Sequence, residues 1–221
     1  MSREKVLSLL LEQGDSYVSG EAMSRVLGIS RAAVWKAIEA LRQEGYEIQS
    51  APKRGYRLER APDRVREGEL AGPLAGCHVG SRLMCLDVID STNTEAKRQA
   101  MAGAPDGLVI LSEEQTGGRG RLGRAWAGAP GQALYCTVVL KTPLAQPGTL
   151  PLFASLAVAD TLRQRYGVQC QIKWPNDLWC VGRDPAGEGR KLGGILIETV
   201  GTAPATRQAV VGIGLNVRSP D

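Results

Sequence analysis

Residues 115–126 read Gln-Thr-Gly-Gly-Arg-Gly-Arg-Leu-Gly-Arg-Ala-Trp, and this stretch decides how the larger part of the chain is interpreted. It follows the apolar run 108–112, which predicts a β-strand, and it holds four glycines and three arginines without an acidic residue. Glycine lets backbone amides approach an oxyanion closely, and arginine neutralises carboxylate or phosphate with paired donors. The loop therefore favours an anionic, phosphate-bearing ligand. A flexible surface loop or a nucleic-acid-binding segment stays open as the alternative.

Gly118, Gly120 and Gly123 also have the G-x-G-x-x-G spacing of a dinucleotide-binding turn. That motif must open a helix directly after a strand, whereas residues 125–135 are interrupted by glycine and proline and lead into another apolar run. Arginine side chains would also crowd the close helix–strand packing that the third glycine serves. The sequence thus argues against a dinucleotide site.

The segment around the loop alternates between strand-like and helical runs. Helices are predicted at 92–101 and 152–166. Strands are predicted at 84–89, 108–112, 133–139, 171–174, 194–198 and 208–212. Strands outnumber helices, and helices do not recur after each strand. We therefore predict an α+β domain, a mixed sheet with helices on one face.

Residues 1–58 follow a different pattern, with three short helices before two strand-like runs. Ser19 and Ser30 are placed to cap the second and third helices, and Gly28 suits a left-handed turn between them. The runs 46–49 and 56–58 are joined by a basic turn at 51–55, which is typical of a winged helix-turn-helix. The second helix is expected to bury Ala22, Met23, Val26 and Leu27, and the third, over 31–44, Val34, Ile38 and Leu41.

A charged, proline-containing segment at 59–72 predicts a linker. We therefore divide the chain into a winged helix-turn-helix DNA-binding domain, 1–63, and an α+β domain, 64–221. The candidate DNA contacts lie at the start of the third helix, at Arg31, Ala32, Trp35 and Lys36. In the wing, Lys53, Arg54 and Arg57 are expected to reach phosphates. The segment from Arg31 to Arg57 holds six basic and three acidic residues. This small surplus of positive charge favours dimeric or weak DNA binding. A module that contacts another protein is the alternative.

Bulk composition narrows the class of protein further. The formal net charge of +4 permits anionic partners without demanding them. No apolar run reaches the length of a membrane span, and the N-terminus lacks a signal-peptide cleavage site, so we expect no membrane association. Five cysteines without a C-x-x-C pair predict free, buried thiols in a reducing cytoplasm. With His78 as the only histidine, a zinc site is not expected.

Four further motifs stand beside the loop in a fixed order. They are Asp90-Ser-Thr-Asn93, Lys173-Trp-Pro-Asn-Asp177, Lys191-Leu-Gly-Gly-Ile-Leu-Ile-Glu198 and Gly212-Ile-Gly-Leu-Asn-Val217. With the Gly-Arg-Gly-Arg loop, this set resembles the biotin protein ligase family over nearly the whole chain. The segments Gly28-Ile-Ser-Arg-Ala-Ala-Val34 and Gly55-Tyr56 are similar to the N-terminal module of its bifunctional members, the biotin operon repressors.

The resemblance implies an ATP- and Mg²⁺-dependent reaction in two steps, formation of biotinyl-5′-AMP and transfer of biotin to a lysine of a carboxylase's biotin carboxyl carrier domain. It implies that Lys173 is the leading catalytic residue, together with Arg119, and that Lys191 approaches the biotin carboxyl group. The biotin head group would meet Ser91, Thr92, Asn93 and Gln115, and the carboxylate and α-phosphate would meet Gly118, Arg119, Gly120 and Arg121. Trp126, Asn176 and Asn216 would serve the nucleotide, with Asn176 also positioning magnesium.

The same resemblance implies operator DNA and a second copy of the chain as partners, with the adenylate as corepressor. Family members continue past the Gly-x-Asn motif into a small C-terminal β-barrel, but this sequence stops at Asp221, so we expect that barrel to be absent. Two alternatives stay open. One is a DNA-binding biotin sensor without ligase turnover, and the other is a lipoate ligase-like enzyme.

Overall fold

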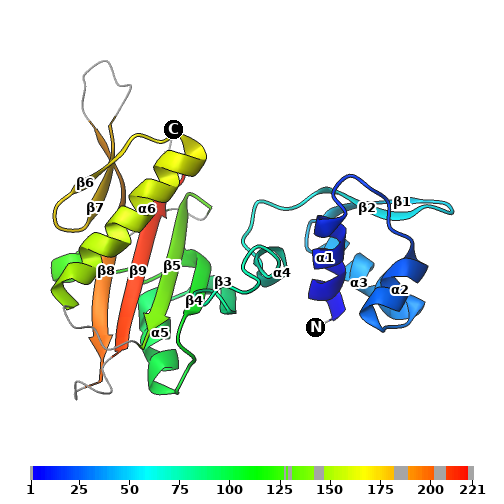
Figure 1. Ribbon diagram of the computed structural model, residues 1–221, viewed down its shortest axis with the longest axis horizontal. Coiled ribbons are helices and arrows are strands. Elements are labelled where there is room, and N and C mark those ends of the chain that lie inside the picture. Colours follow the sequence, from blue (N-terminus) through cyan, green and yellow to red (C-terminus); the bar gives the residue numbers. More distant parts are fainter. Residues whose placement is uncertain are drawn as a thin grey trace. The chain divides into compact units, whose positions relative to one another are not determined.

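The computed structural model describes residues 2–126, 128, 131–141, 147–181, 189–201 and 208–218. The chain forms two compact units, Met1–Ala75 and Gly76–Asp221 (Figure 1). Within the described part, no helix is both long and apolar enough to cross a membrane. All five cysteines are free, as predicted, but Cys77 is exposed and only Cys170 is fully buried.

The first unit is a winged helix-turn-helix. Its elements are α1 (Ser2–Glu12), α2 (Gly20–Leu27), α3 (Arg31–Gln43), β1 (Glu47–Ala51), β2 (Gly55–Arg60) and α4 (Glu67–Leu70). The predicted caps are present, since Ser19 Oγ accepts from the Ala22 amide and Ser30 Oγ from the Ala33 amide. Gly28 takes the left-handed conformation that the turn between α2 and α3 requires, at φ 65°.

Two expectations for this unit were wrong or incomplete. Val26 is 68% exposed, because the short helix α2 buries only Met23 fully. The segment expected to be a linker contains α4, which packs on α1: Ser8 Oγ donates to the Gly68 carbonyl at 3.0 Å. Tyr46 Oη likewise donates to Glu69 at 2.7 Å. The first unit therefore extends to Ala75, beyond the boundary that the sequence placed at residue 63.

The close approach of Val18 to the wing makes Gly55 irreplaceable. A Cβ on Gly55 would lie far inside the contact distance of the Val18 carbonyl oxygen, and φ is +104°. We expect Gly55→Ala to lower the free energy of unfolding by about 3 kcal/mol, of which roughly 1 kcal/mol is backbone strain and the rest is the steric overlap. Urea unfolding checks this against Gly14→Ala, where φ is also positive (+54°) but no atom lies within 4 Å of the added Cβ. Equal losses in the two variants would contradict the steric account.

The second unit is an α+β domain built on one seven-stranded mixed sheet. Its strands are β3 (Arg82–Ile89), β4 (Leu108–Gln115), β5 (Ala133–Leu140), β6 (Cys170–Lys173), β7 (Asp177–Cys180), β8 (Arg190–Val200) and β9 (Gln208–Asn216). The order is β3-β4-β5-β9-β8-β7-β6, and only β3 and β4 run parallel. The helices are α5 (Thr92–Met101) and α6 (Leu150–Tyr166), with short 3₁₀ turns at Arg121–Gly123 and Pro147–Thr149.

The two long helices cover opposite faces of the sheet, so the prediction of helices on one face was wrong. Val210 of β9 packs with Ala96 and Ala100 of α5. The next residue, Val211, packs with Ala159 of α6. Successive side chains of a strand point to opposite faces, so the sheet is sandwiched between α5 and α6, and Figure 1 shows α6 lying across it.

Candidate functional site

A cavity of about 350 Å³ lies in the second unit, between the turn after β3, the glycine–arginine loop (residues 116–126) and strands β8 and β9. It brings together ten of the residues singled out from the sequence: Ser91, Thr92, Asn93, Gln115, Arg119, Gly120, Arg121, Trp126, Asn176 and Lys191. Three others, Gly118, Lys173 and Asn216, are not part of its wall.

The turn after β3 is joined to β4 by the Gln115 side chain. Gln115 Oε1 accepts from the Thr92 amide at 2.7 Å and from the Thr92 hydroxyl at 2.9 Å. The Thr92 hydroxyl also bonds Thr137 Oγ1 at 2.8 Å. These bonds fix the amide of Gln115 with its oxygen toward Thr92. Among the described residues, no group is hydrogen-bonded to its Nε2. This donor therefore stays available to a ligand in the cavity.

Asn93 lies in the wall, but its amide is used by the fold. Nδ2 donates to Glu198 Oε2 at 2.9 Å and to the Leu196 carbonyl at 3.3 Å, and Oδ1 accepts from Thr137 at 2.8 Å. Burial alone would raise the pKa of Glu198, but hydrogen bonds from Lys97 and Asn93 hold that pKa below its usual value. Asn93 therefore supports the cavity wall, and of the polar residues Ser91, Thr92, Asn93 and Gln115, those with a side-chain donor not taken up by the described residues are Ser91 and Gln115.

Two glycines of β9 form the floor, and sequence reasoning did not count them among the site residues. A Cβ on Gly212 would overlap the amide of Asn93, and a Cβ on Gly214 would lie 2.6 Å from the indole of Trp126. Glycine inside a strand often marks a close approach by another group, which was the available signal. Tyr135 and Asp177, which also line the cavity, were not assigned to it either.

The glycine–arginine loop is folded back on itself. The Gly120 amide donates to the Arg124 carbonyl at 2.7 Å, and the Trp126 amide donates to the Gly118 carbonyl at 2.9 Å. Gly118 lies against Trp126 so closely that a Cβ would overlap the Trp126 carbonyl oxygen, so its part is to shape the loop. The loop also reaches the turn between β6 and β7, where Arg121 donates to Asn176 Oδ1 at 3.0 Å.

Lys191, on β8, is the lysine that lies in the cavity wall. Its ammonium nitrogen lies 2.9 Å from Asp177 Oδ1 and 5.2 Å from the ring centroid of Trp126. Asn216 is outside the wall but donates from Nδ2 to the Lys191 carbonyl at 3.1 Å, so it fixes the backbone that carries this lysine.

Lys173 lies beside the cavity and not in its wall, since it pairs across the β6–β7 turn with Asp177, which is part of the wall. It ends the edge strand β6, its side chain is exposed, and its ammonium nitrogen stacks 4.4 Å from the ring centroid of Trp179. The leading catalytic candidate of the sequence is therefore outside the described wall, as are Gly118 and Asn216, although it is paired with the wall residue Asp177.

The wall is strongly cationic. Within the described residues, Arg119, Arg121, Arg124 and Lys191 face a single carboxylate, that of Asp177. Paired guanidinium donors and an ammonium group suit carboxylate and phosphate oxygens. The arrangement can bind a ligand that joins a neutral hydrogen-bonding group to an acid or a phosphate.

The first unit presents a separate candidate surface for DNA. Arg31, Ala32, Trp35 and Lys36 of α3 are all exposed, as are Lys53 and Arg54 of the wing. Two other basic residues are engaged by the fold. Arg42 donates to the Ile48 carbonyl and to Ser50, tying α3 to the wing.

Arg57, suggested by the sequence as a phosphate contact, bonds Glu59 at 2.8 Å and Gln49 at 3.1 Å. Arg54 and Arg57 both lie over the ring of Tyr17, at 4.4 and 5.0 Å from its centroid. Because Arg57 already has a carboxylate partner, Arg54 is the better placed of the two to meet an outside phosphate.

Fold and cavity together define an α+β domain with a cationic ligand site, preceded in the sequence by a winged helix-turn-helix. The profile of the biotin/lipoate A/B protein ligase family matches residues 85–216, and an HTH domain profile matches residues 2–57. The chain belongs to the biotin/lipoate A/B protein ligase family.

Similar proteins agree with this assignment. The bifunctional ligase/repressor BirA of Bacillus subtilis is 36% identical over 217 residues, which are 97% of this chain and 65% of that protein. BirA of Escherichia coli is 34% identical over 214 residues, 96% of this chain and 62% of that protein. The structure of biotin protein ligase from Aquifex aeolicus in complex with biotin and ATP is similar with a TM-score of 0.52 and 29% identity, covering 64% of this chain and 54% of that one. The chain thus spans less than two thirds of the length of these relatives.

Proposed function

We propose that this chain is a biotin protein ligase of the bifunctional kind, which activates biotin with ATP and transfers it to a lysine of a biotin carboxyl carrier domain. The observation that carries the proposal is the make-up of the cavity, where neutral groups at Ser91 and Gln115 share one space with Arg119, Arg121 and Lys191. The urea of biotin needs the neutral partners, because an unpaired buried polar group is costly. A carboxylate and a phosphate need the cations.

The reaction has two steps. A carboxylate oxygen of biotin attacks the α-phosphorus of ATP and displaces pyrophosphate, and the amine of the acceptor lysine then attacks the acyl carbon and releases AMP. Negative charge develops on phosphate oxygens in the first step, and fixed cations lower such a barrier more than water does. Arg119, Gly120 and Arg121 hold the acid and phosphate, and the loop that carries them shields the labile adenylate from water.

Within this proposal, Lys191 is the principal catalytic lysine and Lys173 is not. Lys191 lines the cavity beside the arginines, whereas Lys173 is outside the wall and its ammonium lies over the ring of Trp179. Asp177, whose Oδ1 lies 2.9 Å from the Lys191 ammonium nitrogen, holds the lysine beside the cavity until the substrate carboxylate arrives.

The nucleotide belongs on the side of Trp126 and Asn176. Trp126 offers the face of an indole, and Asn216 acts through the backbone of Lys191. Magnesium keeps water and substrate phosphates as most of its ligands, so it needs few protein oxygens. Asp177 and Asn176 are the neighbouring oxygen donors in the described wall that would hold it with the triphosphate.

The winged helix-turn-helix supports a second activity, repression through operator DNA. Arg31, Ala32, Trp35 and Lys36 would meet base edges, and Lys53 and Arg54 would meet phosphates. The modest charge surplus of one protomer favours a homodimer on DNA, with the adenylate as corepressor. We place the protein in the cytoplasm, where the acceptor carboxylase and the operator both occur.

The test is incorporation of radiolabelled biotin into a biotin carboxyl carrier domain, with ATP and magnesium. We expect incorporation that depends on both the acceptor lysine and ATP. Binding of biotin without incorporation would favour the sensor alternative. Incorporation that lipoate suppresses at equal concentration, or replaces, would favour a lipoate ligase-like enzyme.

A further inference from the structure

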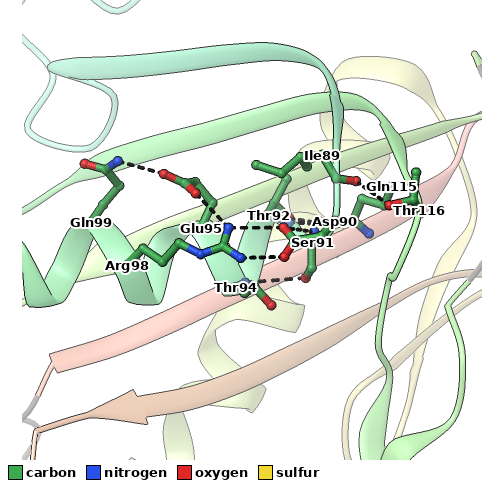
Figure 2. A network of polar contacts seen from close by, with 10 residues as sticks. All are labelled: Ile89, Asp90, Ser91, Thr92, Thr94, Glu95, Arg98, Gln99, Gln115 and Thr116. Carbon is green, nitrogen blue, oxygen red and sulfur yellow. Dashed lines mark hydrogen bonds and ion pairs between the residues drawn. The ribbon is translucent and has the colours of Figure 1, made fainter.

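An ion pair outside the cavity holds the turn that begins its head-group wall. Arg98 of α5 donates to Asp90 Oδ2 at 2.6 Å and to Oδ1 at 3.3 Å, and also to Glu95 Oε2 at 3.0 Å (Figure 2). Neither Asp90 nor Arg98 lines the cavity. The hydrogen bond from Arg98, above all, holds the pKa of Asp90 below its usual value, so Asp90 stays a carboxylate near neutral pH.

Asp90 is the junction between the head-group wall and the glycine–arginine loop. Its carboxylate accepts from the Ser91 amide at 2.7 Å, and its backbone carbonyl accepts from the Gly117 amide at 2.8 Å. One residue earlier, the Ile89 carbonyl accepts from the Thr116 amide at 2.9 Å (Figure 2). The turn after β3 and the base of the loop are thus joined by consecutive bonds, and the Asp90 side chain is the part that Arg98 fixes.

The pair contributes little to global stability. The side chains of Arg98 and Asp90 are 52% and 46% exposed, and ion pairs that are open to solvent typically contribute about 0–1 kcal/mol. An effect of Arg98 on the ligand would therefore act through geometry, because outer contacts that lock binding groups in place set how well a site is preorganised.

We propose that Arg98 is a positioning residue for the ligand site: by clamping Asp90 it sets where Ser91 and the base of the glycine–arginine loop stand relative to each other. Without Arg98, the Asp90 side chain can rotate away and the Ser91 amide loses its acceptor. The proposal rests on the proposed function in so far as the ligand is taken to be biotin.

The experiment is calorimetric titration of the full chain with biotin. Arg98→Ala is expected to bind biotin about tenfold more weakly, the lower end of what loss of an orienting outer contact costs in metal sites. Arg98→Lys should recover part of the loss, because it restores the charge without the two-pronged contact. The matched control is Arg163→Ala on α6, which removes a similarly exposed pair with Asp160 at 3.2 Å, and a long hydrogen bond to the Cys170 carbonyl, and should leave the Kd unchanged.

Two further readouts separate positioning from a loss of folding. The double variant Asp90→Ala/Arg98→Ala should bind biotin about as weakly as the weaker-binding of the two single variants, Asp90→Ala and Arg98→Ala. The losses should not add, because both changes break the same contact. Hydrogen exchange should quicken at the amides of Ser91 and Gly117 in Arg98→Ala, with a melting temperature close to that of the parent. Unchanged biotin affinity with unchanged exchange at these amides would overturn the proposal, as would additive losses. Failure of the parent chain to bind biotin, with faster exchange still seen in Arg98→Ala, would refute the proposed function but leave the clamp intact.

Discussion

Gly214→Val is expected to weaken biotin binding roughly a hundredfold, since overpacking a tight site costs up to about 3 kcal/mol and each 1.4 kcal/mol is about tenfold in Kd. The Cβ would lie 2.6 Å from the Trp126 indole, a rigid ring without a flexible end that could yield. Because Gly214 and Trp126 both line the cavity, displacement of the indole changes the shape of the wall that meets the ligand. Calorimetry with biotin measures the effect directly.

The control for Gly214→Val is Gly148→Val, because no atom lies within 4 Å of a Cβ at Gly148. A second control is the pair of variants Trp126→Ala and Trp126→Ala/Gly214→Val. With the indole gone, the valine should cost little more. A valine that weakens binding equally with and without the indole would show that the contact with Trp126 is not the cause.

Lys191→Ala is expected to slow adenylate formation by about 10²–10³, the usual cost of removing one preorganised stabilising group. Lys173→Ala should slow it by no more than about fivefold, because an exposed cation–π contact is worth about 0.5–1 kcal/mol and lies outside the cavity. The measurement is the biotin-dependent rate of pyrophosphate release for the two variants side by side.

Lys191→Arg serves as the matched control, because it keeps the positive charge opposite Asp177. It should retain more activity than Lys191→Ala. A larger loss from Lys173→Ala than from Lys191→Ala would contradict the placement of the catalytic charge and restore the ranking that the motifs alone suggested.

The sequence predicted the elements of the fold more successfully than their arrangement. The helix at Thr92–Met101 has the predicted bounds, because Ser91 caps its start and the apolar pattern ends at Met101. The strand β7 was missed, because four residues directly after a proline-containing turn carry no readable alternation. The placement of α5 and α6 on opposite faces of the sheet was missed as well. Which face of a sheet a helix covers depends on contacts that composition does not encode.

For the site, motifs identified the correct neighbourhood but not the direction of each side chain. Lys173 and Lys191 both stand in motifs at strand ends. Only the fold shows that Lys173 lies on an edge strand over Trp179, whereas Lys191 lies in the cavity wall. Asn93 was predicted to bind the ligand because an amide side chain can donate and accept hydrogen bonds. In the fold, that amide is hydrogen-bonded to Glu198 and Thr137. These partners lie about a hundred and about forty residues away in sequence, beyond the reach of any local pattern.

The most direct test of the central claim is the formation of biotinyl-5′-AMP from biotin and ATP labelled at the α-phosphate, separated by thin-layer chromatography. The full chain with magnesium should give a labelled product that requires biotin and that Lys191→Ala largely abolishes. Absence of a biotin-dependent product from the parent chain, under conditions in which it binds ATP and biotin, would contradict the assignment of this cavity to adenylate formation.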